Sequence, residues 1–381
     1  MKSIFIIVFL TILVIYSLAS YYLWIRGVAA FSIAEPQKKW YLLGFILISA
    51  SFFVGMILER TASSAFSEWV VRIGTTWLPF LLYFLMAIIF IDIIRIFNYF
   101  FHFLPEITPS LKQTVGIVTV VIVSLVVIAG HINAMIIRVK EIPLTIDKPV
   151  TGNPRMKVLM VSDIHLGALI GERHEKHLLK IIREQKPDLV LICGDLIDSE
   201  LAPVLRKKLG KHIQEIKTPM GVYAVTGNHE YIGGINQSLD YLKSIHINVL
   251  VDSIITLPNG VQLIGRNDRA AGQGKNGRKP LAELFKGIDP AKPVIVMNHQ
   301  PYNLSEASVL KTDLHLSGHT HHGQMWPFNY ITQSMFELSW GYLKKDQTHF
   351  YVSSGFGTWG PAMRLGNRPE VVVFELTFER R

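Results

Sequence analysis

Aspartate, asparagine and histidine residues follow directly after short apolar runs at five places in the second half of the chain. The first run ends at Asp163 and His165, and residues two apart in an extended chain point to the same side. A carboxylate and an imidazole that point to one place suit a divalent cation. Such a pair alone is weak support for a site, because it is also common in surface turns.

The same arrangement recurs after four further apolar runs, at residues 189–193, 222–226, 293–297 and 314–317. These runs lead to Asp195, to Asn228 and His229, to His299, and to His319 and His321. Open α/β sheets place their sites at the carboxyl ends of strands, so the runs predict one shared site. Glycines precede Asp195, Asn228 and His319, which allows tight turns and close approach of the backbone.

The composition indicates that part of the chain lies in a membrane. Hydrophobic residues make up 50% of the 381 residues, and the mean hydropathy of +0.32 is high for a soluble enzyme. The formal net charge is +9, but there is no dense basic run of the kind that nucleic-acid-binding proteins carry. We therefore expect an integral membrane protein that does not bind nucleic acid.

Four apolar segments near the N-terminus are long enough to span a bilayer. They cover residues 4–25, 40–58, 77–97 and 115–137. The first segment continues into Tyr21, Tyr22 and Trp24, past any small-residue cleavage site, which favours a membrane span over a cleaved signal peptide. Residues 1–140 are predicted to form a multi-pass domain of about four helices in the cell membrane.

Basic residues do not specify the orientation of these spans. The side of the two termini carries Lys2, Arg60, Arg72, Arg138 and Lys140, and the other side carries Arg26, Lys38, Lys39 and Lys112. The positive-inside rule therefore has almost no imbalance to act on. Asp92 and Arg95, near the end of the third span, are interpreted as an ion pair at the membrane boundary rather than an intramembrane charge site.

The rest of the chain reads as a linker followed by an α/β domain. Residues 141–154 contain three prolines and a Gly-Asn pair, which predict an extended linker. Apolar runs then alternate with helix-like segments over residues 155–381, as is typical of α/β proteins. Helices are predicted over residues 172–184, 205–216 and 235–245, late strands over 350–353 and 371–377, and a hairpin over 249–257 and 261–264.

The polar, glycine-rich segment 265–280 leaves two interpretations open. It carries the basic residues Arg266, Arg269, Lys275, Arg278 and Lys279. These residues could form a flexible flap that holds an anionic headgroup. A solvated surface loop explains the same composition and is the preferred interpretation.

The polar motifs together resemble those of the calcineurin-like metallophosphoesterase family. The matching motifs are Asp163-x-His165, Gly194-Asp195-x-x-Asp198, Gly227-Asn228-His229-Glu230, Asn298-His299 and Gly318-His319-Thr320-His321. The residues from Gly318 to Gln324 resemble the bacterial branch of membrane-linked or exported phosphoesterases. That branch usually has two glycines after the last histidine. Here His322 takes the first of those places, which predicts a bulky side chain at the edge of the cleft.

The resemblance implies a four-layer α/β/β/α fold with two mixed sheets face to face, and it implies two metal ions. The first ion would be held by Asp163, His165, Asp195 and His321, and the second by Asp195, Asn228, His299 and His319. Carboxylate, amide and imidazole ligands without thiolates favour Mn, Fe, Zn, Ni or Co. Asp195 would bridge the two ions, and a hydroxide shared by both ions would attack phosphorus.

Four further residues receive supporting roles. His229 is predicted to be the general acid for the leaving group or to stabilise the phosphoryl oxygens, against a purely structural hydrogen bond to backbone. Asp198 is expected to support the site through hydrogen bonds. Glu230 is expected to orient a neighbouring imidazole. Arg364 could clamp a phosphate, and a structural ion pair explains it about equally well.

The predicted function is a membrane-anchored dimetal phosphoesterase that hydrolyses a phosphodiester or pyrophosphate bond. Anchoring raises the local concentration of lipid-linked or envelope molecules, which makes these molecules candidate substrates. The resemblance to exported enzymes favours an extracytoplasmic catalytic domain. The alternative function is a non-catalytic metal-binding module on the same scaffold. Such a module should have lost metal ligands, whereas this chain keeps the full set.

Overall fold

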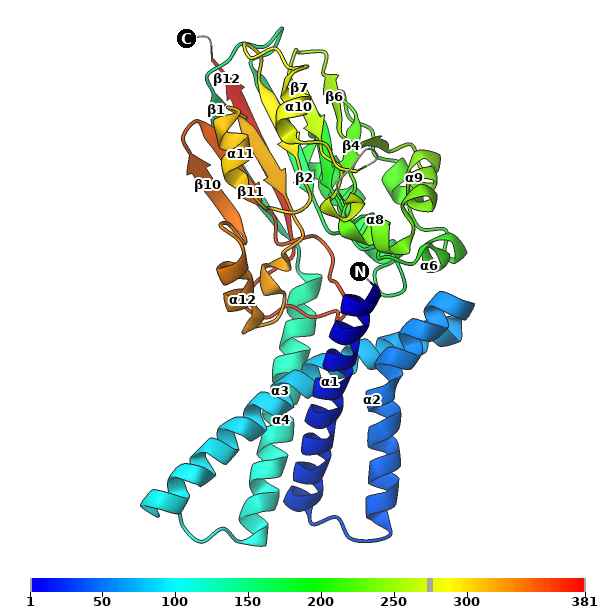
Figure 1. The fold of residues 1–381 in the computed structure, drawn as a ribbon, viewed down its shortest axis with the longest axis vertical. Helices are drawn as coiled ribbons and strands as arrows, with labels where there is room; N and C mark the ends of the chain where they lie inside the picture. The colour runs from blue at the N-terminus through cyan, green and yellow to red at the C-terminus, as the bar shows by residue number, and fades with distance from the viewer. Residues whose placement is uncertain (1, 273–276, 380–381) are drawn as a thin grey trace. The chain divides into compact units, whose positions relative to one another are not determined.

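The computed structural model describes residues 2–272 and 277–379. The chain folds into two compact units, Met1–His131 and Ile132–Arg381. Long helices make up the first unit, and strands and shorter helices make up most of the second (Figure 1). The unit boundary lies before the predicted linker, so residues 132–154 group with the α/β unit.

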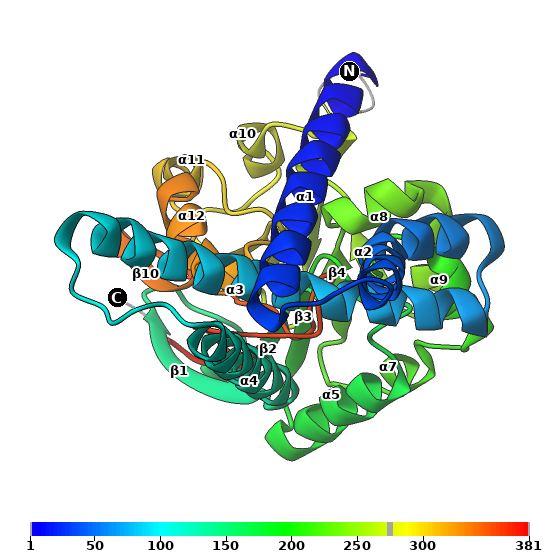
Figure 2. The ribbon, with the colours of Figure 1, turned by 90° about the horizontal axis from the view of Figure 1, so that it is seen from below.

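Four long helices form the first unit (Figures 1 and 2). They are α1 (Lys2–Phe31), α2 (Gln37–Ala62), α3 (Ala65–Phe101) and α4 (Pro109–Met135), the last four residues of which fall in the second unit. All four are long and apolar enough to cross a membrane, which confirms the prediction of four spans. With 37 residues, α3 is about 55 Å long and exceeds the roughly 30 Å hydrocarbon core of a bilayer.

Small residues allow α2 and α3 to pack closely after a tight turn. A side chain at Gly74 would place its Cβ 2.3 Å from the Cα of Phe52, so only glycine permits this approach. The turn itself ends in a capping box, in which the Ser64 and Ser67 side chains each accept a hydrogen bond from the other residue's backbone N–H. The Ser67 hydroxyl also donates to the buried Glu59 carboxylate, over 2.6 Å.

Two six-stranded mixed sheets form the centre of the second unit (Figure 1). The first sheet has the order β1-β12-β2-β3-β4-β5, and the second has the order β10-β11-β9-β8-β7-β6. The first contains β1 (Arg138–Ile146), β2 (Arg155–Val161), β3 (Leu189–Cys193), β4 (Val222–Val225), β5 (Asn248–Leu250) and β12 (Glu370–Phe378). The second contains β6 (Ser253–Thr256), β7 (Gln262–Gly265), β8 (Val294–Met297), β9 (Leu314–Ser317), β10 (Gly341–Lys345) and β11 (Thr348–Val352).

Helices cover the outer faces of both sheets, so the unit has the predicted four layers. The helices are α5 (Glu172–Gln185), α6 (Leu201–Arg206), α7 (Lys211–Gln214), α8 (Asn228–Gly233), α9 (Ile235–Ser244), α10 (Leu281–Phe285), α11 (Leu304–Val309) and α12 (Phe328–Met335), with short 3-10 turns η1 (Arg269–Ala271) and η2 (His321–Gly323). Three apolar cores follow from this layering: helices against the first sheet, sheet against sheet, and second sheet against α10 and α11.

The strands next to the site are buried on both faces. In β2, Leu159 and Val161 face the helices, whereas Val158 and Met160 face the other sheet, as the two-residue period of a strand requires. Such strands read as continuous apolar runs, which explains why they were recognisable in the sequence. The parallel strands β2, β3 and β4 end at one edge of their sheet, and β8 and β9 end together in the other.

The first strand of the unit was not predicted. Residues 141–146, assigned to the linker, belong to β1, which pairs in parallel with β12 over its whole length. The sheet tolerates Pro143 because β1 is an edge strand and needs hydrogen bonds on one side only. Half of the strand is exposed, so its sequence lacks a continuous apolar run.

Two other predicted elements differ from the structure. The helix predicted over 205–216 is divided into α6 and α7, because Gly210 adopts φ +90° and leaves the helical region. The predicted hairpin exists only between β6 and β7. Asn248–Leu250 instead forms β5 and pairs with β4 in the other sheet.

Candidate metal centre

The carboxyl ends of strands from both sheets bring the predicted ligands together. Asp163 follows β2, Asp195 follows β3, Asn228 follows β4, His299 follows β8, and His319 follows β9. Residues that are far apart in sequence therefore meet where the two sheet edges face each other. The donor atoms form groups in which they lie within 4.8 Å of one another.

One group consists of Asp163, His165 and His321. The Nε2 atoms of His165 and His321 lie 3.0 Å apart, and His321 Nε2 lies 3.5 Å from Asp163 Oδ1. His165 and Asp163 are fully buried. Two imidazole nitrogens and a carboxylate oxygen therefore point to a common position inside the protein.

A second group consists of Asp195, His299 and His319, with Asn228 beside them. His299 Nε2 lies 3.0 Å from Asp195 Oδ2 and 3.1 Å from Asn228 Oδ1. The other ring nitrogen, His299 Nδ1, donates to the carbonyl oxygen of Cys193 over 2.8 Å. This bond to the end of β3 fixes the ring and turns Nε2 toward the site. Asp195 Oδ2 also lies 4.0 Å from His165 Nε2, so this carboxylate stands between the two groups.

This set of side chains fits the pair of divalent cations that the family implies. Burying carboxylates is costly unless a positive charge compensates them, and the Asp163 and Asp195 side chains are at most 2% exposed. The donors converge without a thiolate among them, which suits Mn, Fe, Zn, Ni or Co. The chemistry of the donor set therefore matches a cation site rather than an apolar core.

The electrostatics of the site keep its central carboxylates ionised. Burial alone would raise the pKa of Asp195, but the adjacent His299 outweighs it and the pKa lies well below its usual range. Burial likewise opposes the ionisation of Asp198, yet the neighbouring imidazoles of His165 and His229 lower its pKa to about 2. For His229, burial lowers the pKa, and the Asp198 carboxylate reverses that effect and raises it.

The backbone of the site is held in an unusual conformation. Asp163, His165, Asp195, His319 and His321 all have φ between 45° and 73°. A non-glycine residue in this left-handed region costs about 1–2 kcal/mol, and such residues concentrate at functional sites. The sharp turns place these donors immediately past the strand ends, where the apolar sequence stops.

Glycines make room for the ligands. A Cβ at Gly318 would lie 2.3 Å from Asp163 Oδ2, and a Cβ at Gly227 would lie 2.1 Å from Asp195 Oδ1. Neither position can accept a side chain without moving a predicted ligand. The close approach expected from the sequence is therefore present in the structure.

His229 lies beside the first group, and its Nδ1 atom is held by neighbours that are not predicted ligands. Its Nδ1 atom is 3.1 Å from Asp198 Oδ1 and 2.8 Å from the Ser199 hydroxyl oxygen. Its ring lies 4.6 Å from that of His165, centroid to centroid. Asp198 Oδ1 is also 3.6 Å from His165 Nδ1, so Asp198 contacts two histidines of the site, in line with its expected supporting role.

Glu230 has a different role from the one expected. Its carboxylate accepts hydrogen bonds from the backbone N–H groups of Gly227 (2.7 Å), Asp195 (3.2 Å) and Ile197 (3.0 Å). It therefore ties the turn after β3 to the turn after β4, rather than orienting an imidazole. The sequence contained no signal for these contacts, because their partners are backbone groups that only the fold brings close.

Arg364 is buried completely and supports the site from behind. Its guanidinium donates to the carbonyl oxygens of Ser354 (2.6 Å) and Gly357 (2.5 Å), and its Nη2 atom lies 3.2 Å from His321 Nδ1. The interpretation as a phosphate clamp is wrong, because these groups already occupy the guanidinium. Arg364 positions the His321 ring instead.

Two further expectations, about His322 and about segment 265–280, also differ from the structure. The His322 ring is buried, packs on the Trp340 ring and lies 3.1 Å from the Ser339 hydroxyl, so it does not project at the cleft edge. In the described part of segment 265–280, Arg266 contacts Glu306 and Arg278 donates to Asn298 Oδ1 over 2.7 Å. These arginines turn inward, unlike those of a solvated loop. Lys275 lies outside the described residues.

Comparison with known proteins agrees with this geometry. The family model described as calcineurin-like phosphoesterase matches residues 156–323. An uncharacterized metallophosphoesterase of Aquifex aeolicus is 31% identical over 64% of this chain and 93% of its own. One of Campylobacter jejuni is 27% identical over 98% of this chain and 99% of its own.

A mammalian relative is itself named as a transmembrane protein. The bovine transmembrane protein with metallophosphoesterase domain is 28% identical over 69% of this chain, and the match spans 62% of that relative's length. Together with the four apolar helices, this similarity supports a membrane protein. The fold, the clustered donors and the Aquifex similarity lead to one assignment: the chain belongs to the calcineurin-like metallophosphoesterase family.

Proposed function

We propose that this protein is a membrane-anchored hydrolase that cleaves a phosphodiester or pyrophosphate bond with the help of two divalent cations. The family indicates a metal-dependent phosphoester hydrolase. The observation that carries the proposal is the complete set of seven donors gathered at the two sheet edges.

Each of the two donor groups would hold one of the cations. Asp163, His165 and His321 would hold one ion, Asn228, His299 and His319 the other, and Asp195 would serve both. Bound cations supply Lewis acidity toward the phosphoryl group and a nucleophilic water at neutral pH. Manganese is one candidate among the metals that this donor set suits.

His229 is the side chain that we assign to the leaving group. Asp198 and Ser199 engage its Nδ1 atom, which leaves Nε2 as the nitrogen that can donate a proton. A positioned imidazole of this kind protonates the leaving oxygen or stabilises the phosphoryl oxygens, a contribution of about 10²–10⁴-fold in rate.

Exposed apolar side chains beside the site support a substrate that carries an apolar chain. Trp359 is 58% exposed although its ring centroid lies 6.1 Å from that of His229. Helix α12 is the next helix after the turn η2, which contains His321. It buries none of its residues and exposes the large hydrophobic residues Phe328, Tyr330, Ile331 and Met335. We therefore favour a lipid-linked or envelope phosphoester as the substrate. The resemblance to exported phosphoesterases is the ground on which we place the protein in the cell membrane with its catalytic unit extracytoplasmic.

Metal-dependent hydrolysis by the full chain in detergent tests the proposal. After chelation and readdition of Mn²⁺ or Zn²⁺, we expect turnover of an aryl phosphodiester above that of the matching monoester. Metal binding without turnover of either ester would instead support a non-catalytic module.

A substrate pair tests the apolar approach separately. Trp359→Ala should raise KM severalfold for a lipid-linked diester while leaving a water-soluble diester unchanged. Val309→Ala removes an apolar side chain that is 79% exposed on α11, and it serves as the control. Equal effects of the two variants would remove Trp359 from substrate recognition.

A further inference from the structure

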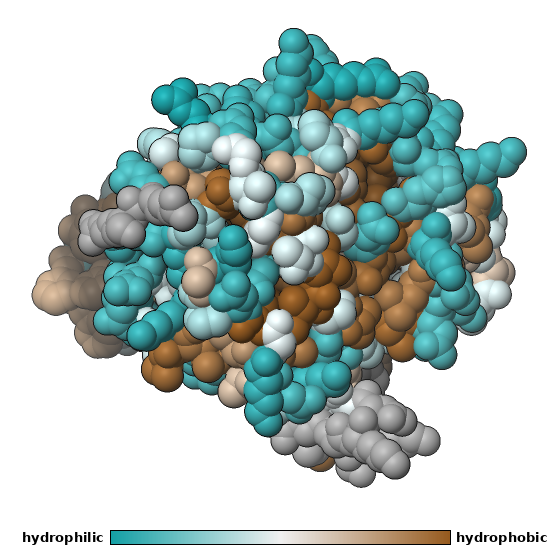
Figure 3. Space-filling view, turned by 90° about the horizontal axis from the view of Figure 1, so that it is seen from above, coloured by the Kyte–Doolittle hydropathy of each residue, from teal (hydrophilic) through white to brown (hydrophobic). Residues whose placement is uncertain are grey.

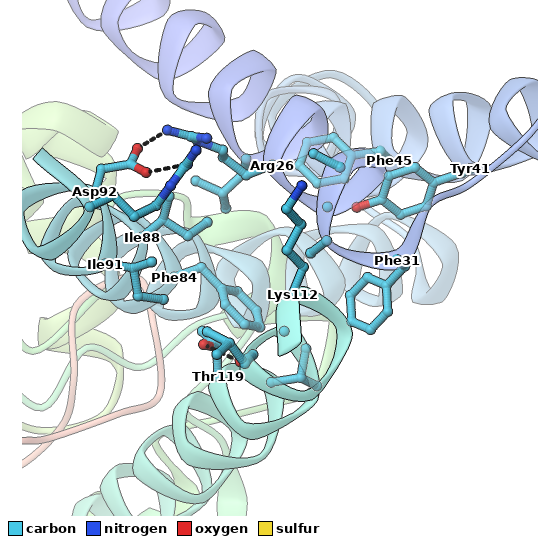
Figure 4. Close-up of a pocket in the computed structure, with 18 of the residues that line it drawn as sticks. Arg26, Phe31, Tyr41, Phe45, Phe84, Ile88, Ile91, Asp92, Lys112 and Thr119 are labelled. Carbon is cyan, nitrogen blue, oxygen red and sulfur yellow. Dashed lines mark hydrogen bonds and ion pairs between the residues drawn. The ribbon is translucent and has the colours of Figure 1, made fainter. Parts of the chain in front are cut away.

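A large apolar cavity lies inside the membrane unit, apart from the candidate metal centre. Its volume is about 830 Å³, within the range of roughly 300–1,000 Å³ that ligand cavities occupy. All four long helices contribute to its wall, including the aromatic residues Phe31, Tyr41, Phe45 and Phe84 (Figure 4). Aliphatic side chains and glycines fill most of the rest, so the lining suits a hydrocarbon chain.

Charged side chains also line this otherwise apolar cavity. Asp92 is paired with Arg26 (Figure 4). The same carboxylate is also paired with Arg95. Lys112 reaches the cavity from α4, and no carboxylate lies within ion-pair distance of it among residues 2–272 and 277–379. Three positive charges face one negative charge, and the excess is +2.

The charges lie at the depth of lipid headgroups. Arg26 is five residues before the end of α1, and Lys112 is three residues after the start of α4. At about 1.5 Å per residue, both lie within about 8 Å of the helix ends that carry the α1–α2 and α3–α4 connections. A span of this length places those ends at the boundary between hydrocarbon and headgroups, where Trp40 and Tyr41 also stand.

We propose that the cavity binds one anionic phospholipid, with an acyl chain among the aromatic residues and its phosphate beside Arg95 and Lys112. Hydrocarbon alone would fill the apolar space without any need for the excess positive charge. A zwitterionic lipid would bring its own cation to a region that is already positive. Charge complementarity therefore selects a lipid with net negative charge.

Native mass spectrometry of the delipidated full chain tests this assignment. The probes are dioleoylphosphatidylglycerol and dioleoylphosphatidylcholine, which share acyl chains and differ in headgroup charge. We expect the phosphatidylglycerol adduct to be retained at about tenfold lower lipid concentration. Equal retention of the two lipids would overturn the proposal.

Charge variants identify where the phosphate sits. The double variant Arg95→Gln/Lys112→Gln keeps the Arg26–Asp92 pair and should reduce the preference for phosphatidylglycerol to nearly none. Lys39 lies near the start of α2 and does not line the cavity. The control variant Lys39→Gln therefore removes one positive charge and should leave the preference for phosphatidylglycerol intact. Unchanged phosphatidylglycerol binding in the double variant would refute the headgroup assignment.

A cavity-filling variant tests the acyl chain independently. Gly44 lines the cavity, and a Cβ there would have nothing within 4 Å. Gly44→Leu should therefore fold, since leucine favours a helix more than glycine does, and it should weaken both lipids severalfold. Full binding of both lipids by a folded Gly44→Leu variant would place the lipid outside the cavity.

Discussion

The two units of this protein treat charge in opposite ways. In the membrane unit, Asp92 is paired with arginines near the ends of the helices, where the charges can reach the headgroups. In the α/β unit, Asp163 and Asp195 lie buried at the centre, surrounded by imidazoles. Hydrophilic side chains meanwhile cover much of the outer face in Figure 3. The buried carboxylates among imidazoles mark a place for chemistry, whereas the paired Asp92 near the helix ends marks an anchoring position.

The largest expected effect is the loss of the carboxylate between the two donor groups. Asp195→Asn should lower hydrolysis by at least about 10³-fold and deplete both metals, because one oxygen donor to each ion loses its charge. Activity and metal content by mass spectrometry are measured on the same preparation. Asp240→Asn changes an exposed carboxylate on α9 and should alter neither. An Asp195→Asn protein with full metal content would contradict the shared role of this residue.

The next largest effect is expected for a variant of His229 that separates metal binding from catalysis. His229→Ala should retain the metals and lose about 10²–10⁴-fold in rate, because the residue is proposed to act on the leaving group. The loss should shrink for a substrate whose leaving group is a good one, such as a nitrophenolate. His177→Ala, on the exposed face of α5, is the matched control. Wild-type rates in His229→Ala would remove this side chain from the mechanism.

Arg364 distinguishes support of the site from contact with the substrate. Arg364→Met leaves several buried carbonyl groups without donors and should cost about 3 kcal/mol or more in the free energy of unfolding. That loss corresponds to a melting temperature about 6–12 °C lower. KM of the remaining folded enzyme should not change, and the exposed Arg368→Met should melt like the wild type. A large rise in KM would revive the phosphate clamp.

The smallest effect concerns a histidine of the second sheet. Burial, followed by repulsion from Arg266 and Arg278, lowers the pKa of His315 to about 3. Between the ordinary value of 6.5 and about 3, the unfolded chain gains a proton that the folded chain excludes. Stability therefore falls with falling pH in that window, by about 1.4 kcal/mol per pH unit for this one group.

Thermal unfolding of the full chain in detergent at pH 7, 6 and 5 measures this contribution. As the pH falls, the free energy of unfolding of the His315→Leu variant should decline less steeply than that of the wild type. The difference in slope should be about 1.4 kcal/mol per pH unit. Parallel stability curves for the two proteins would show that His315 titrates normally in the fold.

The strands and donors were predictable from the sequence because both signals are local. Strands β3 and β9 have the predicted bounds. Strand β3 is an uninterrupted apolar run, β9 carries leucines at alternate positions, and a glycine follows each strand. The polar residues that follow such strands could be assigned to one site, because open α/β sheets place their sites at the carboxyl ends of strands. The four apolar helices were equally readable from length and composition.

Features that depend on distant partners were not predictable. Strand β1 is half exposed, and only its pairing with β12, more than 220 residues later, gives it an ordered conformation. The guanidinium of Arg364 is directed by backbone carbonyls and by His321, 43 residues away. Nothing in the sequence near Arg364 distinguishes a buried support from an exposed anion receptor, because the distinction is one of burial.

The three backbone hydrogen bonds to Glu230 have a consequence for how the two donor groups evolve. One side chain, which touches no predicted ligand's donor atom, sets the spacing between the turn that presents Asp195 and the turn that presents Asn228. A substitution there would shift both halves of the centre at once. In a genetic screen, such a change would be indistinguishable from the loss of a ligand, although every ligand is still encoded.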